Sequence, residues 1–108
     1  MGALKVSLSF LDGSVDSIIA KCTRIATAMT GNKNFPIPPI TPEGLQTSVD
    51  ELKQMQRRAK GNHPQDISNR DIALADVNDF ILQNAAYVEQ ACKNNLEVLL
   101  SSGFDANN

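Results

Sequence analysis

Apolar residues recur along most of the chain with the spacing that places them on one face of an α-helix. In the first such segment they fall at intervals of three and four: Val15, Ile18, Ile19, Cys22, Ile25, Ala26 and Met29. This spacing is typical of an amphipathic helix packed on a core. Ser14 is the expected N-cap, and Gly31 can supply the left-handed residue that ends the helix. We therefore predict a first helix over about 15–30.

A second helix is predicted over about 42–60. Thr41 followed by Pro42 is typical of an N-cap and a first helical position, where the missing N–H of proline costs nothing. Apolar residues then continue at spacings of three and four: Leu45, Val49, Leu52, Met55 and Ala59. The sequence Gly61-Asn62-His63-Pro64 is expected to end this helix.

The longest uninterrupted segment predicts a third helix over about 66–93. Apolar residues keep a spacing near three and a half, and no proline or glycine interrupts 65–102. The helix would be about 42 Å long, so it must overhang its shorter neighbours. We expect Asn94 and Asn95 to break it, so that a short helix over about 96–102 folds back, followed by a frayed end at 105–108.

The N-terminal segment has a different pattern, in which apolar and polar residues alternate. Leu4, Val6, Leu8 and Phe10 are separated by single polar residues, which predicts an extended arm over 4–10 with one buried face. No second strand pattern is present in the sequence. Two interpretations follow: an arm that lies along the helices, which we favour, or a strand that pairs with another chain.

Between the first two helices lies a proline-rich tether over 34–41. Pro36, Pro38 and Pro39 exclude helix and favour extended backbone. The five-residue link between the second and third helices makes them antiparallel neighbours. We favour an up-and-down arrangement of all three, although the ten-residue connection over 31–40 could span about 31 Å and so allow the first two to run parallel. The chain is thus predicted to be one all-α domain over 1–108, a helical bundle.

Composition excludes several classes of partner. The 108 residues carry a formal net charge of −2, which gives no electrostatic basis for binding nucleic acid or an anionic membrane. No apolar run approaches the length of a membrane span, and the first ten residues do not resemble a secretory signal. By default we expect a cytoplasmic protein.

Residues that could perform chemistry are few. The single histidine, His63, lies in a turn sequence without obvious partners, so we expect no metal site, no cofactor and no enzyme activity. Cys22 and Cys92 each fall on an apolar helix face. We favour reduced core thiols, and a bridge between the first and third helices is the alternative.

The sequence therefore favours a non-catalytic interaction or scaffold module that binds another protein or itself as a homodimer. The candidate interaction residues are the apolar positions of the arm and two aromatic residues: Leu4, Val6, Leu8, Phe10, Phe35 and Tyr87. The overhang of the third helix is a further candidate surface. The alternative is a small-ligand-binding protein or accessory enzyme subunit with a pocket between the helices, lined by Met29, Phe35, Tyr87 and Cys92.

Several punctuation motifs of the chain resemble those of a family of small bacterial helical proteins whose biochemical function is not established. The motifs are residues 28–32 (Ala-Met-Thr-Gly-Asn), Phe35-Pro36, Pro38, the helix start at Thr41 and residues 101–104 (Ser-Ser-Gly-Phe). In many relatives the helical region resembles an N-terminal module ahead of a fibronectin type III domain. The resemblance implies a helical bundle with an attachment or scaffold role, and it implies no catalytic residues.

Overall fold

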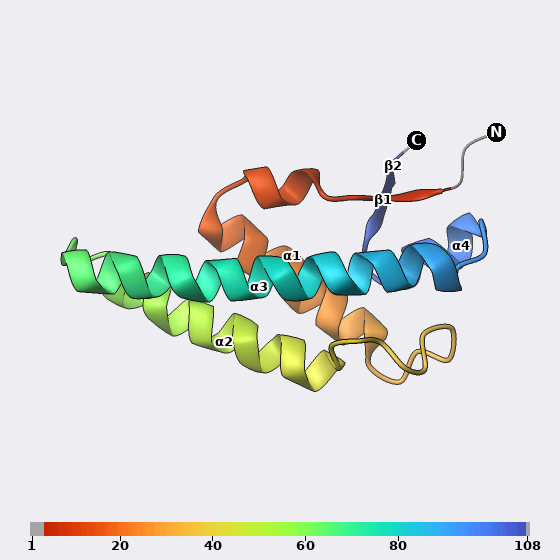
Figure 1. The fold of residues 1–108 in the computed structure, drawn as a ribbon, viewed down its shortest axis with the longest axis horizontal. Helices are drawn as coiled ribbons and strands as arrows, with labels where there is room; N and C mark the ends of the chain where they lie inside the picture. Colours follow the sequence, from red (N-terminus) through yellow and green to blue (C-terminus); the bar gives the residue numbers. More distant parts are fainter. Residues whose placement is uncertain (1–3, 108) are drawn as a thin grey trace.

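Four helices dominate a computed structural model of the protein, which describes residues 4–107 (Figure 1). They are α1 (Val15–Met29), α2 (Pro42–Ala59), α3 (Pro64–Ala91) and α4 (Leu96–Leu100). Figure 1 shows α1, α2 and α3 running alternately in opposite directions. The prediction of an all-α bundle is confirmed, and the favoured up-and-down topology is the one observed.

The observed boundaries of α3 and α4 differ from the predicted ones at residues that form caps and turns. α3 begins at Pro64, two residues earlier than predicted, because proline occupies the first helical position and His63 serves as N-cap. It ends at Ala91, since Lys93 and Asn94 both adopt left-handed backbone conformations (φ 50° and 62°). The predicted fourth helix over 96–102 stops at Leu100, where the chain enters a turn.

The predicted extended arm over 4–10 is only partly extended. Strand β1 covers Lys5–Ser7, and a 3-10 helix, η1, follows at Ser9–Asp12. The predicted frayed end is wrong for the described residues: Asp105–Asn107 form strand β2, which pairs antiparallel with β1. Position 108, included in that prediction, lies outside the described residues. The arm therefore finds its strand partner within its own chain.

Gly103 makes this strand pairing possible because it brings the backbone against α1. Its φ of 88° is in the left-handed region that favours glycine. A Cβ at this position would lie 2.9 Å from Cα of Ile25, which is closer than Cβ atoms come to other heavy atoms in folded proteins. The turn therefore passes directly over α1 and delivers Phe104 into the core, where it is 1% exposed.

The tether is bent instead of extended. Residues 33–34 form a turn, and further bends occur at 36–37 and 39–40. The connection begins with two backbone hydrogen bonds, from Asn32 N to Met29 O and from Phe35 N to Asn32 O. It crosses between α1 and α2 at the end of the bundle where β1, β2 and α4 also lie (Figure 1).

The two ends of the molecule are built differently. At the closed end, the tether and β1 pack on the C-terminal part of α3 (77–91), and α4 lies against β2. At the open end, the α2–α3 hairpin (50–59 and 64–76) continues beyond α1, as Figure 1 shows. The predicted overhang is therefore present, and it gives the molecule its 48 Å long axis.

Candidate functional site

The candidate residues of the arm pack inward. Val6 is buried, and Leu4, Leu8 and Phe10 are half-buried against the core. Both edges of β1 are occupied within the chain: β2 pairs with one, and side chains of the α3 end accept hydrogen bonds from the other. Val6 N donates to Glu89 Oε2 at 2.7 Å, and Leu4 N donates to Asn94 Oδ1 at 2.7 Å. The amide groups at this edge of β1 are thus already paired within the chain.

The two aromatic candidates hold the tether on α3. Phe35 is 2% exposed, and its ring meets that of Tyr87 edge to face, with 6.1 Å between centroids. The Tyr87 hydroxyl accepts a hydrogen bond from Ile37 N at 3.2 Å. This pair is internal support for the closed end, with only the half-buried Tyr87 reaching the surface.

Asn84 has a structural role that sequence reasoning missed. It is 1% exposed in the C-terminal part of α3, and its amide makes two hydrogen bonds to the backbone of Ile40. Ile40 N donates to Oδ1 and Nδ2 donates to Ile40 O, both at 3.0 Å. The sequence signal that could have revealed this role is an asparagine within the apolar stripe of α3, three residues after Ile81 and four before Val88.

Of the residues predicted to line a ligand pocket, Met29, Phe35 and Cys92 are buried in the core and Tyr87 is half-buried. A hollow of about 310 Å³ beside the tether is lined by Met29 and Phe35, but Tyr87 and Cys92 are not among the residues that line it. This hollow therefore brings together two of the four predicted residues.

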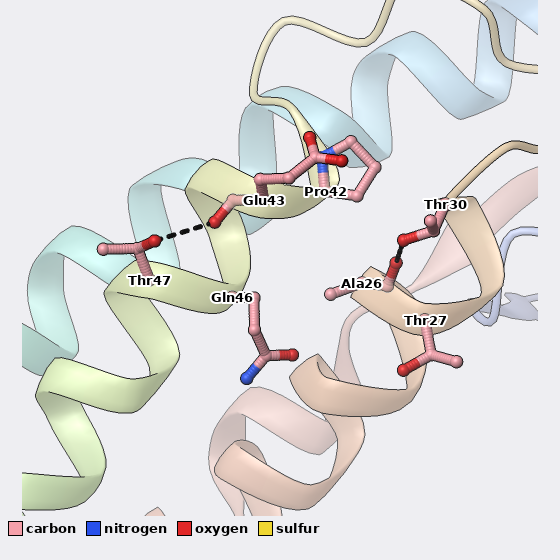
Figure 2. Close-up of a pocket in the computed structure, with 7 residues that line it drawn as sticks. All are labelled: Ala26, Thr27, Thr30, Pro42, Glu43, Gln46 and Thr47. Atoms are coloured by element: carbon pink, nitrogen blue, oxygen red, sulfur yellow. Dashed lines mark hydrogen bonds between the residues drawn. The ribbon is translucent and has the colours of Figure 1, made fainter.

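A second hollow, of about 350 Å³, lies between the C-terminal end of α1 and the start of α2 (Figure 2). Several of its polar groups already bond within their own helices. The Thr30 hydroxyl donates to Ala26 O, the Thr47 hydroxyl donates to Glu43 O, and Gln46 Nε2 donates to Asp50. The Glu43 carboxylate remains as the charged group at its rim, in the first turn of α2.

The open end carries an uncovered face of the α2–α3 hairpin. A groove of about 180 Å³ runs between the two helices, and a hollow of about 580 Å³ adjoins it along α3. Ile72 lines both and is 61% exposed. The groove is lined by Glu51, Met55, Asn69, Ile72, Ala73 and Asp76. The hollow is lined by Pro64, Ile67, Ser68, Asp71, Ile72 and Ala75.

This face lies on the opposite side of α2 from α1. Gln46 lines the hollow shared with α1, and Met55 follows it by nine positions. Nine residues rotate a helix by two and a half turns, so the two side chains project in opposite directions. α1 therefore covers one side of the hairpin and leaves the Met55 side open.

Reactive groups do not converge on any of these sites. His63 is exposed and its side chain makes no capping hydrogen bond. Both cysteines are free and buried, and burial raises the pKa of the Cys22 thiol from 9.0 to about 12, so the thiolate form is suppressed. Among residues 4–107, no three histidine, cysteine or acidic side chains gather as metal ligands would. No helix within that range has the length and apolarity needed to span a bilayer.

Comparison with known proteins adds no assignment. The chain matches no protein-family model, no curated protein and no solved structure. The resemblance to the bacterial helical family therefore stays a prediction, and the functional argument depends on the geometry of the molecule.

Proposed function

We propose that the chain is a non-catalytic interaction module that binds a protein partner, a second copy included, through the open face of the α2–α3 hairpin. The observation that carries the proposal is the placement of Ile72. It stands exposed between a groove and a hollow, on the side of the hairpin that α1 leaves uncovered. Exposed apolar residues next to grooves on helix pairs are the usual anchors for a partner helix.

Two free, buried cysteines agree with a reducing compartment, so the proposal places the module in the cytoplasm. The scaffold role implied by the family resemblance is of the same kind. In this proposal the bundle positions a docking face, and the closed end keeps that face rigid.

Photo-cross-linking in the producing cells tests this function. A photo-reactive amino acid would replace Ile72 in one variant and Leu96 in a matched control, because Leu96 is 48% exposed on α4 at the closed end. We expect a discrete adduct with one protein from position 72 and none of that mass from position 96. Identical adducts at both positions, or none at either, would refute the proposal.

The hollow in Figure 2 favours a second candidate function, the binding of a small ligand. Its volume of about 350 Å³ lies at the lower end of the range for ligand pockets. Native mass spectrometry of the purified protein tests it: a retained small molecule that Gln46→Trp displaces would support this function, and a bare chain without stabilisation across a metabolite screen would count against it.

A further inference from the structure

The open face of the α2–α3 hairpin is complementary to itself. On α2, Glu51, Met55 and Arg58 follow one another at intervals of four and three, so they lie along one side of the helix. An acid and a base thus flank an apolar residue almost symmetrically. If the same stretch of a second copy lies antiparallel to it, each Arg58 comes opposite the other copy's Glu51, with the two Met55 side chains between them.

Neither charge has a local partner that would compete for it. The positions three and four residues away from Glu51 and Arg58 hold no residue of opposite charge. Within residues 4–107 the ion pairs are Lys21 with Asp105 and Arg70 with Asp71, so Glu51 and Arg58 take part in neither. Both side chains are exposed and remain available to a second molecule.

The apolar part of the face fits the same register. Met55 shares the groove with Asn69 and Ile72, so the midpoint of the Glu51–Arg58 stretch lies level with about residue 71 on α3. A second copy related to the first by a two-fold axis at that level runs antiparallel to it. The Ile72 of the second copy then lies at about the level of residue 70 of the first. The hollow of about 580 Å³ is lined by residues 64–75, and this level is at its middle. Each exposed Ile72 therefore meets the hollow of the other copy.

From this agreement we infer that the partner of the open face is a second copy of this chain, docked antiparallel as a two-fold symmetric dimer with a four-helix contact. The inference rests on the proposed function and names its partner. A two-fold interface requires one patch that is complementary to itself. The order of a negative charge, an apolar residue and a positive charge along α2 meets that requirement, because in the antiparallel copy each charge faces its opposite. The insertion of Ile72 into the facing hollow resembles the packing of knobs into holes between antiparallel helices.

Sedimentation equilibrium of the purified full chain, from about 5 μM to about 1 mM, tests the inference. We expect the mass to rise with concentration from 11.7 kDa towards twice that value. Ile72→Asp should weaken the dimer at least tenfold, because it places a carboxylate in the apolar hollow. Leu100→Asp, at a residue 47% exposed on α4, is the matched control and should leave the dimer unchanged.

Charge reversal tests the register. Glu51→Arg alone and Arg58→Glu alone should each weaken the dimer about tenfold, since like charges then face each other. The double variant restores the pairing and should return to within about threefold of the wild type. Circular dichroism checks that these exposed substitutions leave the helices intact.

Three results would overturn the inference. If the chain is monomeric at every concentration, the inferred dimer does not exist. In that case an adduct with a different protein from position 72 would still uphold the proposed function. A dimer that tolerates Ile72→Asp uses another face. A dimer lost in both single charge variants and not restored in the double variant has another register.

Discussion

The closed and open ends of the molecule share α3 but differ in how many segments pack on it. At the closed end the tether and β1 pack on the helix, and buried side chains such as Asn84 hold the backbone of the tether in place. At the open end α3 has α2 as its neighbour, and Ile72 is exposed. The difference indicates two tasks: the closed end stabilises the fold, and in our proposal the open end binds the partner.

The largest effect is expected from the tether residue Phe35. Phe35→Ala should lower the free energy of unfolding by about 3–5 kcal/mol, because it removes a fully buried ring and leaves a cavity. Ile37→Ala, two residues along the same tether but 80% exposed, is the control and should cost less than about 0.5 kcal/mol. Urea unfolding monitored by circular dichroism measures both. Equal losses would show that the tether does not anchor the closed end.

Two asparagines of α3 give the next comparison. Asn84→Leu removes both hydrogen bonds to Ile40 and leaves a partly buried N–H and C=O unpaired, so it should cost about 2–3 kcal/mol. Asn78 has a buried Oδ1 without a hydrogen-bond partner. Asn78→Leu should therefore be neutral or stabilise by up to about 1 kcal/mol. Thermal and urea unfolding of the two variants should move in different directions, and a shared loss would contradict this assignment of roles.

Glu89 tests how firmly the strand is attached to the helix. Glu89→Ala removes the acceptor of the Val6 N–H and should cost about 1.5 kcal/mol, as expected for a hydrogen bond to a charged group. Hydrogen exchange by NMR should show faster exchange at Val6, with exchange in the middle of α2 unchanged. Glu97→Ala, at an exposed residue of α4, is the control. Unchanged protection at Val6 would mean that β2 alone holds the strand.

The free energy of unfolding should depend on pH in the alkaline range through the Cys22 thiol, which lies in the core. Burial raises the pKa of this thiol from 9.0 to about 12, so above pH 9 the unfolded chain releases a proton that the folded chain keeps. The unfolded state then binds fewer protons, and stability falls as pH rises, by about 1 kcal/mol between pH 9 and 10. Below pH 9 this contribution is fully present. Cys22→Ala should lower stability at pH 7 but remove this part of the slope; parallel pH profiles for the two proteins would refute it.

The smallest effect is expected at the open end. Ile72→Ser should change the free energy of unfolding of the monomer by less than about 0.5 kcal/mol, because the side chain is already mostly exposed. Unfolding is measured at micromolar concentration, where association contributes little. A loss comparable to that of Phe35→Ala would show that Ile72 belongs to the core, and the contrast between the two ends would fail.

The helices were predictable because each carries its own pattern. The apolar stripes of α1 and α2, the N-caps Ser14 and Thr41, and the uninterrupted length of α3 depend on neighbours in sequence. The overhang followed from helix lengths alone. Periodicity is least informative at helix boundaries: α3 begins at Pro64, two residues before the predicted start.

The remaining features depend on contacts between distant segments. Strand β2 has three residues with no apolar alternation, so only its pairing with β1 makes it a strand. The tether bends because Asn84 and Tyr87 bind its backbone from α3. The candidate interaction residues of the arm and tether pack against their own chain, because the tertiary structure decides which surface an apolar residue contacts. Their role in binding a partner stays a prediction.

The pairing of β1 with β2 also has a consequence for the time course of folding. Its register joins Lys5 to Asn107, so almost the whole chain must be looped before the first hydrogen bond of the sheet forms. Contacts of such long range close late, whereas the α2–α3 hairpin can form from adjacent segments. During synthesis β1 leaves the ribosome well ahead of its partner and must wait unpaired until residues 105–107 emerge. We therefore expect the sheet to be the last part of the fold to form.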